Sequence, residues 1–178
     1  MQEQIRWYAI NVRVGAEVRL RESLSIKGCQ VFLPTALEVR RYSDRLKRVD
    51  SPLFPGYLFA RFDASKSLPF ITTPGVHSIV SIDSVHPWPI DDYEIEAIMK
   101  VVSSGASAIP WPFLNIGDKV KITFGPLTGV EGLLVRTNQK EQLVLSINLL
   151  QRSLAVEIDR SFIRPLVDYR SDFRRLSV

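Results

Sequence analysis

The sequence has little of what metal binding, disulfide bonding or membrane insertion requires. It holds one cysteine, Cys29, which excludes an internal disulfide. Its two histidines, His77 and His86, stand apart without the spacing of a metal site. No stretch approaches the roughly 18 apolar residues of a membrane span, and nothing near the N-terminus resembles a signal peptide. We therefore expect a cytoplasmic protein that enters no membrane and uses no metal or other cofactor.

Arrangements of residues that carry catalysis are also missing. The glycine-rich residues 125–129 lie between two expected strands and lack the lysine of a phosphate-binding loop. Asp91 is followed three residues later by Glu94, which predicts a capping box at the start of a helix. The neighbouring acidic residues fit a helix N-terminus, which favours negative charge, better than a pair of catalytic carboxyl groups. We predict that the chain is not an enzyme.

Positive charge is concentrated in one short stretch. Over the whole chain of 178 residues the net charge is only +4, and the apolar fraction of 46% is ordinary for a folded domain. A local basic cluster can bind phosphate groups without sequence specificity, whereas a solvated charged hairpin is the simpler interpretation. The cluster consists of Arg40, Arg41, Arg45, Lys47 and Arg48.

Residues 5–102 have the pattern of an α+β domain. Apolar periodicity and capping signals separate short alternating strands from amphipathic helices. The order of these elements predicts an antiparallel sheet flanked by helices. We expect strands at residues 7–12, 30–33, 57–62 and 78–82, a hairpin at 35–42 and 46–50 with its turn at 43–44, and helices at 16–27, 65–73 and 91–102.

The rest of the chain changes character. Residues 103–113 are small and polar, then rich in proline, which predicts a linker. Residues 114–167 alternate short strands with tight turns, as a small and partly open all-β barrel does, and residues 168–178 read as a frayed tail. Glycines and β-branched residues oppose helix formation in residues 114–167, so we expect the barrel in the isolated protein.

One run, residues 53–62, combines a proline and a glycine with four aromatic residues. Its alternation predicts a strand entered through a Pro-Gly turn. The run is either an ordinary core strand or the edge of a docking surface. Alternation allows a division in which Phe54, Pro55 and Tyr57 face a partner while Leu58 and Phe62 face the core.

The pattern Gly117-Asp118-x-Val120-x-Ile122-x-x-Gly125-Pro126-Leu127-x-Gly129-x-x-Gly132 resembles the KOW motif of NusG-type transcription elongation factors. Trp7-Tyr8, the Phe54-Pro55-Gly56-Tyr57 run and the helix at 91–102 are similar to the N-terminal domain of the same family. The resemblance covers residues 6–167 and implies a monomeric elongation or antitermination factor with an α+β domain, a linker and a KOW barrel. The runs at 31–34 and 149–153 resemble specialised paralogues such as RfaH and the UpxY-like antiterminators.

The resemblance also implies protein partners for each domain. The N-terminal domain would bind RNA polymerase through an apolar depression, although Phe59 fits plain core equally well. The KOW domain would bind a small-subunit ribosomal protein or the termination factor Rho through Leu150 and Arg152, with a core role as the alternative for Leu150. The residues implied for the polymerase surface are Asn11, Phe54, Pro55, Tyr57, Phe59 and Ile79.

Contacts with DNA are implied at two places. Arg13 and Arg19 match positions at which RfaH-type paralogues read the non-template strand, but Ser23 and Pro74 replace a histidine and an arginine of that pattern, which argues against the same sequence specificity. The basic hairpin would add phosphate contacts to upstream DNA. A function of another class is an RNA- or ribosome-binding module, because a KOW barrel suffices for it.

Overall fold

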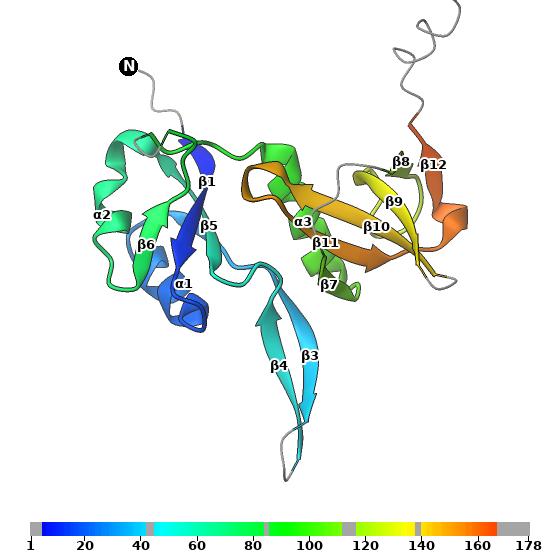
Figure 1. Ribbon diagram of the computed structural model, residues 1–178, viewed down its shortest axis with the longest axis horizontal. Helices are drawn as coiled ribbons and strands as arrows, with labels where there is room; N and C mark the ends of the chain where they lie inside the picture. Colours follow the sequence, from blue (N-terminus) through cyan, green and yellow to red (C-terminus); the bar gives the residue numbers. More distant parts are fainter. Residues whose placement is uncertain (1–4, 42–44, 84–85, 112–116, 138–139, 167–178) are drawn as a thin grey trace, which may run out of the picture.

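The computed structural model describes residues 5–41, 45–83, 86–111, 117–137 and 140–166. Figure 1 shows an N-terminal sheet with its helices, a C-terminal sheet, and helix α3 between them. The architecture is mixed α/β with antiparallel sheets and few helices, as predicted. Within these residues, no helix is long and apolar enough to cross a membrane.

The N-terminal sheet has four strands in the order β2-β5-β1-β6, all antiparallel to their neighbours. Helices cover both of its faces, so β1 buries consecutive residues instead of alternate ones. The strands are β1 (Ile5–Val12), β2 (Gln30–Phe32), β5 (Tyr57–Asp63) and β6 (Val76–Ile79), and the helices are α1 (Glu17–Ser25), α2 (Leu68–Ile71) and α3 (Asp92–Ser104).

The two faces of this sheet belong to separate apolar clusters. Tyr8, Leu58 and Phe62 pack with residues of α1 and α2, including Leu20 and Phe70. Trp7, Ala9 and Phe59 pack with Ile95 and Ile98 of α3. That second cluster continues without a break into the C-terminal sheet. The two domains therefore share one core on the α3 side.

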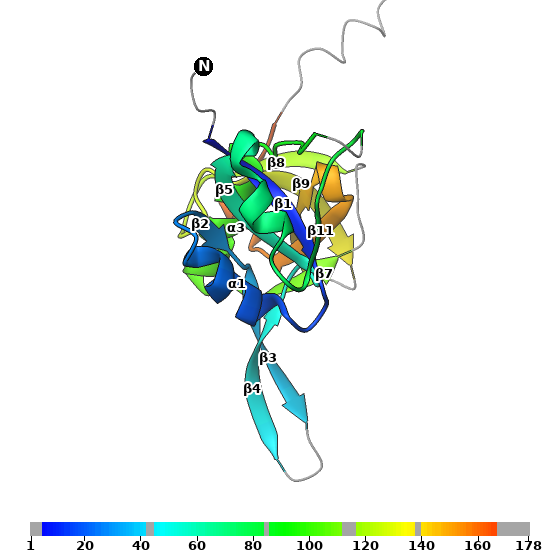
Figure 2. The same ribbon diagram turned by 90° about the vertical axis from the view of Figure 1, so that its left-hand side faces the viewer.

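Strands β3 (Thr35–Arg41) and β4 (Leu46–Pro52) form a two-stranded hairpin. Figures 1 and 2 show it projecting away from the rest of the molecule. Its predicted turn at Ser43–Asp44 lies outside the described residues.

The C-terminal domain is a six-stranded antiparallel sheet in the order β12-β8-β9-β10-β11-β7. At Gly132 a Cβ atom would lie 2.7 Å from the carbonyl oxygen of Val144, so only glycine allows β9 to lie this close to β10. The strands are β7 (Ala108–Trp111), β8 (Asp118–Ile122), β9 (Glu131–Thr137), β10 (Lys140–Ile147), β11 (Arg152–Glu157) and β12 (Ile163–Pro165), with short 3-10 segments at Ala64–Lys66, Asn148–Leu150 and Arg160–Phe162.

The segment expected to be a linker differs from the prediction. Ser103 and Ser104 end α3, and Gly105 stops the helix with a φ of +69°. Residues 108–111 then pair with β11 as an edge strand, where Pro110 is tolerated. Residues 112–116 and the expected tail lie outside the described residues. The domain boundaries 5–102 and 114–167 stay predictions.

Candidate functional site

The Phe54-Pro55-Gly56-Tyr57 run is a tight turn at the start of β5. The amide of Tyr57 donates to the carbonyl of Phe54 at 3.0 Å, which closes the turn. Proline in the second place and a glycine with φ of +82° in the third are the residues of a type II turn. The carbonyl of Gly56 accepts from the amide of Val12 at 2.9 Å and so ties the turn to the end of β1. The turn is therefore held both by its own hydrogen bond and by a hydrogen bond to β1.

A buried carboxylate holds this turn in place. Glu17, in the first turn of α1, is only 3% exposed, and its Oε1 accepts from the amide of Gly56 at 3.0 Å. Sequence reasoning missed this contact, because the two residues lie 39 positions apart. The turn that carries the aromatic side chains is thus attached to α1.

The aromatic residues divide between the two faces of the sheet as alternation predicts. Leu58 and Phe62 face α1 and α2, while Tyr57 and Phe59 lie on the α3 side. Phe54 packs edge-on against Phe59 with ring centres 5.6 Å apart, and both are almost fully buried. Of the three residues expected to face a partner, Pro55 is exposed and Tyr57 is half-buried.

Asn11 and Ile79, the remaining residues of the expected polymerase surface, lie on opposite faces of the sheet. Asn11 lies opposite Tyr57 in the β1–β5 register, so both project on the same side of the sheet. Ile79 instead belongs to the cluster under α1 and α2, with Leu58. The structure gathers Asn11, Phe54, Tyr57 and Phe59 on one face and leaves Ile79 on the other. We call this group of four the aromatic face.

The C-terminal domain lies against the aromatic face. Its Asn148–Leu150 segment connects β10 to β11, and Leu149 and Leu150 pack, half-buried, against the apolar cluster that runs through both domains. The guanidinium carbon of Arg152 lies 5.9 Å from the centre of the Tyr57 ring, within the range of a cation–π contact. The two predicted partner sites, one on each domain, therefore contact each other.

A second contact between the domains involves Glu94 of α3, which is 5% exposed. Its Oε1 accepts one hydrogen bond from the side-chain Nδ2 of Asn148 at 2.6 Å and another from the backbone N–H of Asn148 at 3.4 Å. Burial raises the pKa of Glu94, and the bonds from Asn148 oppose that rise. The predicted capping box is wrong, because this carboxylate turns to the C-terminal domain and the Asp91 side chain makes no capping bond.

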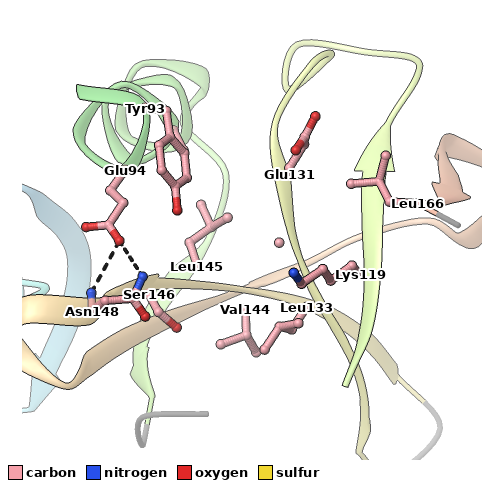
Figure 3. A pocket seen from close by; sticks show the side chains of 12 residues that line it. Tyr93, Glu94, Lys119, Glu131, Leu133, Val144, Leu145, Ser146, Asn148 and Leu166 are labelled. Carbon is pink, nitrogen blue, oxygen red and sulfur yellow. Dashed lines mark hydrogen bonds between the residues drawn. The ribbon is translucent and has the colours of Figure 1, made fainter. Parts of the chain in front are cut away.

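Beside this contact lies a cleft of about 360 Å³ between α3 and the C-terminal sheet. Figure 3 shows Glu94 and Asn148 at one end of the cleft and Lys119 and Glu131 at the other. No group of three acidic, histidine or cysteine side chains suited to a metal occurs among the described residues. The cleft leaves part of the domain interface unpacked.

The predicted DNA-binding residues occupy two places. Arg13, after β1, and Arg19, on α1, are exposed on the body of the N-terminal domain. Arg40 lies in β3, opposite Lys47 of β4. Among the basic residues predicted to bind DNA through the hairpin, Arg41, Arg45, Lys47 and Arg48 have exposed side chains.

Comparison with known proteins gives a consistent result. The family model described as transcription termination factor NusG matches residues 5–99. The transcription termination/antitermination protein NusG of Escherichia coli K12 is 28% identical over 170 residues, covering 88% of this chain and 93% of that protein. The NusG protein of Pseudomonas aeruginosa is 24% identical over 169 residues, covering 88% of this chain and 96% of its own.

A solved structure supports the fold. It is described as "Domain interaction in Thermotoga maritima NusG" and superposes with a TM-score of 0.53 at 21% identity. The alignment covers 92% of this chain and 98% of that one. The likeness extends over both domains.

Proposed function

The chain belongs to the NusG family of transcription termination/antitermination factors, and we propose that it binds RNA polymerase through the aromatic face. Asn11, Tyr57 and the exposed Pro55 border this surface, and Phe54 and Phe59 form its floor. Aromatic anchors in a desolvated centre supply most of the energy of protein interfaces. Members of the family are transcription factors rather than enzymes, and this proposal needs no catalytic group.

The observation that carries the proposal is that the C-terminal domain already uses this face as a docking surface. Arg152 of the C-terminal domain makes a cation–π contact with Tyr57, and Leu149 and Leu150 beside it pack against the apolar cluster that both domains share. A surface that binds one apolar loop has the chemistry to bind another. Polymerase would have to displace the C-terminal domain, so the two contacts compete.

The C-terminal domain has a binding role of its own in this proposal. Leu150 and Arg152 would contact a small-subunit ribosomal protein or Rho once the domains separate. Arg152 contacts Tyr57 across the domain interface, and Leu150 is half-buried against the apolar cluster that both domains share. The C-terminal partner would therefore also compete with the closed arrangement of the domains. Engagement of polymerase would free this loop for its second partner, which couples the two binding events.

Binding to DNA would be secondary and dependent on salt. The exposed cations of the hairpin, with Arg13 and Arg19, would contact phosphates of the upstream duplex or the non-template strand. Specialisation of the RfaH or UpxY type stays a prediction.

Binding of the full-length chain to purified RNA polymerase from the same organism tests the proposal. Asn148→Ala is expected to raise the affinity, because a protein that binds only in its open form has an apparent Kd divided by the open fraction. Adding Tyr57→Ala in this already opened background is expected to lower the affinity by roughly tenfold or more. Comparing the single with the double variant separates docking from opening.

Trp88→Ala provides the control, since Trp88 is a half-exposed aromatic residue outside the aromatic face. It should leave polymerase binding unchanged. Equal affinities of Asn148→Ala and its Tyr57→Ala derivative would exclude the aromatic face as the docking site. Binding of RNA or ribosomes by a wild-type chain that does not bind polymerase would favour the RNA- or ribosome-binding function instead.

A further inference from the structure

The β3–β4 hairpin carries three large aliphatic side chains that no other described residue of the chain covers. Leu37, Val39 and Leu46 are 74%, 60% and 69% exposed. Figures 1 and 2 show that the hairpin stands clear of both sheets in two perpendicular views. A two-stranded hairpin is marginally stable by itself in water. Exposing three aliphatic side chains on such an element is unusual unless another surface covers them.

The register places all three on one face. Opposite residues of an antiparallel pair project to the same side. Leu37 faces Asp50, Val39 faces Arg48, and Arg41 faces Leu46. One face therefore presents Leu37, Val39 and Leu46 together with Arg41, Arg48 and, near the root, Asp50. We call it the aliphatic face.

The opposite face differs. There Glu38 lies across from Val49 and accepts a hydrogen bond from Ser51, and Lys47 projects to the same side. Positive charge occurs on both faces, but the exposed aliphatic side chains Leu37, Val39 and Leu46 all belong to one. Phosphate binding explains the cations and leaves these three side chains unexplained.

We propose that the aliphatic face is a docking surface for a protein, namely an apolar patch of RNA polymerase edged by carboxylates. The aliphatic side chains require an apolar counterpart, and Arg41 and Arg48 on the same face require acidic groups beside it. A nucleic acid would satisfy only the arginines. The hairpin also continues directly from the aromatic face, since the Leu53 amide donates to the Pro34 carbonyl at 2.9 Å and closes its root next to Phe54.

This inference rests on the proposed polymerase binding, and the experiment keeps the two apart. The full-length chain would carry a photo-crosslinking amino acid in place of Val39, or in place of Val49 on the opposite face. Each protein would be added to an elongation complex assembled from purified polymerase and a nucleic-acid scaffold. The residue at 39 is expected to crosslink to a polymerase subunit in preference to DNA, and more strongly than the residue at 49.

Substitutions give an independent measure. Replacing Leu37, Val39 and Leu46 by threonine keeps β-propensity and removes much of the apolar surface. This triple variant is expected to bind polymerase roughly ten- to a hundredfold more weakly, while its affinity for naked DNA stays unchanged. The double variant Arg41→Gln, Arg48→Gln should weaken both polymerase binding and DNA binding. Lys47→Gln should weaken DNA binding alone.

Several results would overturn the inference. These are a crosslink from position 39 to DNA or to a second copy of the chain, no crosslink at all from that position, or unchanged polymerase affinity of the threonine variant. If polymerase binding still depends on Tyr57 in such a case, only the hairpin inference fails. If the wild type does not bind polymerase, both proposals fail together. A circular dichroism spectrum matching wild type would show that the variants are folded.

Discussion

Arg152 places its guanidinium carbon 5.9 Å from the centre of the Tyr57 ring. The two residues come from different domains, and the family resemblance assigns each to a different partner. Because one contact joins both predicted binding sites, each domain masks the other in this arrangement. Under the proposed function, the open fraction would set the apparent affinity for either partner.

Asn148→Ala is expected to open this arrangement. The variant removes the Nδ2 donor 2.6 Å from the buried Glu94 carboxylate and leaves it only the longer bond of 3.4 Å from the backbone amide of residue 148. Loss of a hydrogen bond to a buried acceptor costs up to about 1–3 kcal/mol. Fluorescence energy transfer between dyes on the two domains should fall as the open fraction rises. Ser103→Ala, an exposed position on the same helix as Glu94, serves as control. Transfer equal to wild type would show that Asn148 does not hold the domains together.

Glu94 should make stability depend on pH. Burial raises its pKa above the ordinary 4.5, so the folded protein binds this proton more tightly than the unfolded chain does. The stability that the group contributes is then fully present below pH 4.5 and is lost as pH rises through the raised pKa. Glu94→Gln keeps a carbonyl acceptor for Asn148 and does not titrate.

Urea unfolding of wild type and Glu94→Gln, from below pH 4.5 to above the raised pKa of Glu94, measures this pH-dependent contribution to stability. The unfolding free energy of wild type minus that of the variant is expected to decrease as pH rises. A difference independent of pH would show that Glu94 has the same pKa in both states. Other titrating groups cancel in the comparison.

Much of the fold was predictable because its signals are local. Apolar periodicity predicted a helix at residues 91–102, where α3 lies, and the apolar residues Ile95, Ile98, Met99 and Val102 of this helix belong to the shared core or pack against it. The edge strand β7 was missed. A serine-rich segment precedes this strand, the strand itself contains Pro110, and it becomes a strand only through pairing with β11, over 40 residues later. The composition of residues 103–113, taken alone, resembles that of a linker.

The candidate site was predictable in part. Alternation correctly divided Tyr57 from Leu58 across the sheet. The Glu94–Asn148 pair joins residues 54 positions apart, a separation that sequence periodicity does not reveal. One signal was available, since Glu94 falls on the buried stripe of α3 with Ala97 and Val101. A carboxylate on an apolar stripe indicates a polar partner.

Gly56→Ala should destabilise the protein by about 1–2 kcal/mol, because a side chain disfavours the left-handed backbone found here. The added Cβ would also lie 3.3 Å from Val14 Cγ2, but Val14 is 69% exposed and has room to move. Gly15→Ala is the matched control, with φ of +85° and no atom within 4 Å of the added Cβ. Similar losses in chemical unfolding are expected for both. A much larger loss at Gly56 would mean that the turn is confined by packing.

Glu17→Ala is expected to loosen the turn that carries Tyr57. The amide of Gly56 would lose its acceptor in a buried position, at a cost of about 1–3 kcal/mol. Glu17→Gln keeps an acceptor oxygen and should cost less. Both variants remove negative charge from the first turn of α1, so the favourable interaction with the helix dipole is lost equally. The difference between them therefore isolates the hydrogen bond.

Hydrogen exchange of the Gly56 amide gives the direct measurement. Exchange should accelerate strongly in Glu17→Ala and modestly in Glu17→Gln. Glu22→Ala, at an exposed position of the same helix, should leave the rate at its wild-type value. Equal exchange rates in Glu17→Ala and wild type would show that α1 does not hold the turn. Because the turn leads into Tyr57, Glu17→Ala should also weaken polymerase binding in the opened Asn148→Ala background, although Glu17 itself is buried away from any partner.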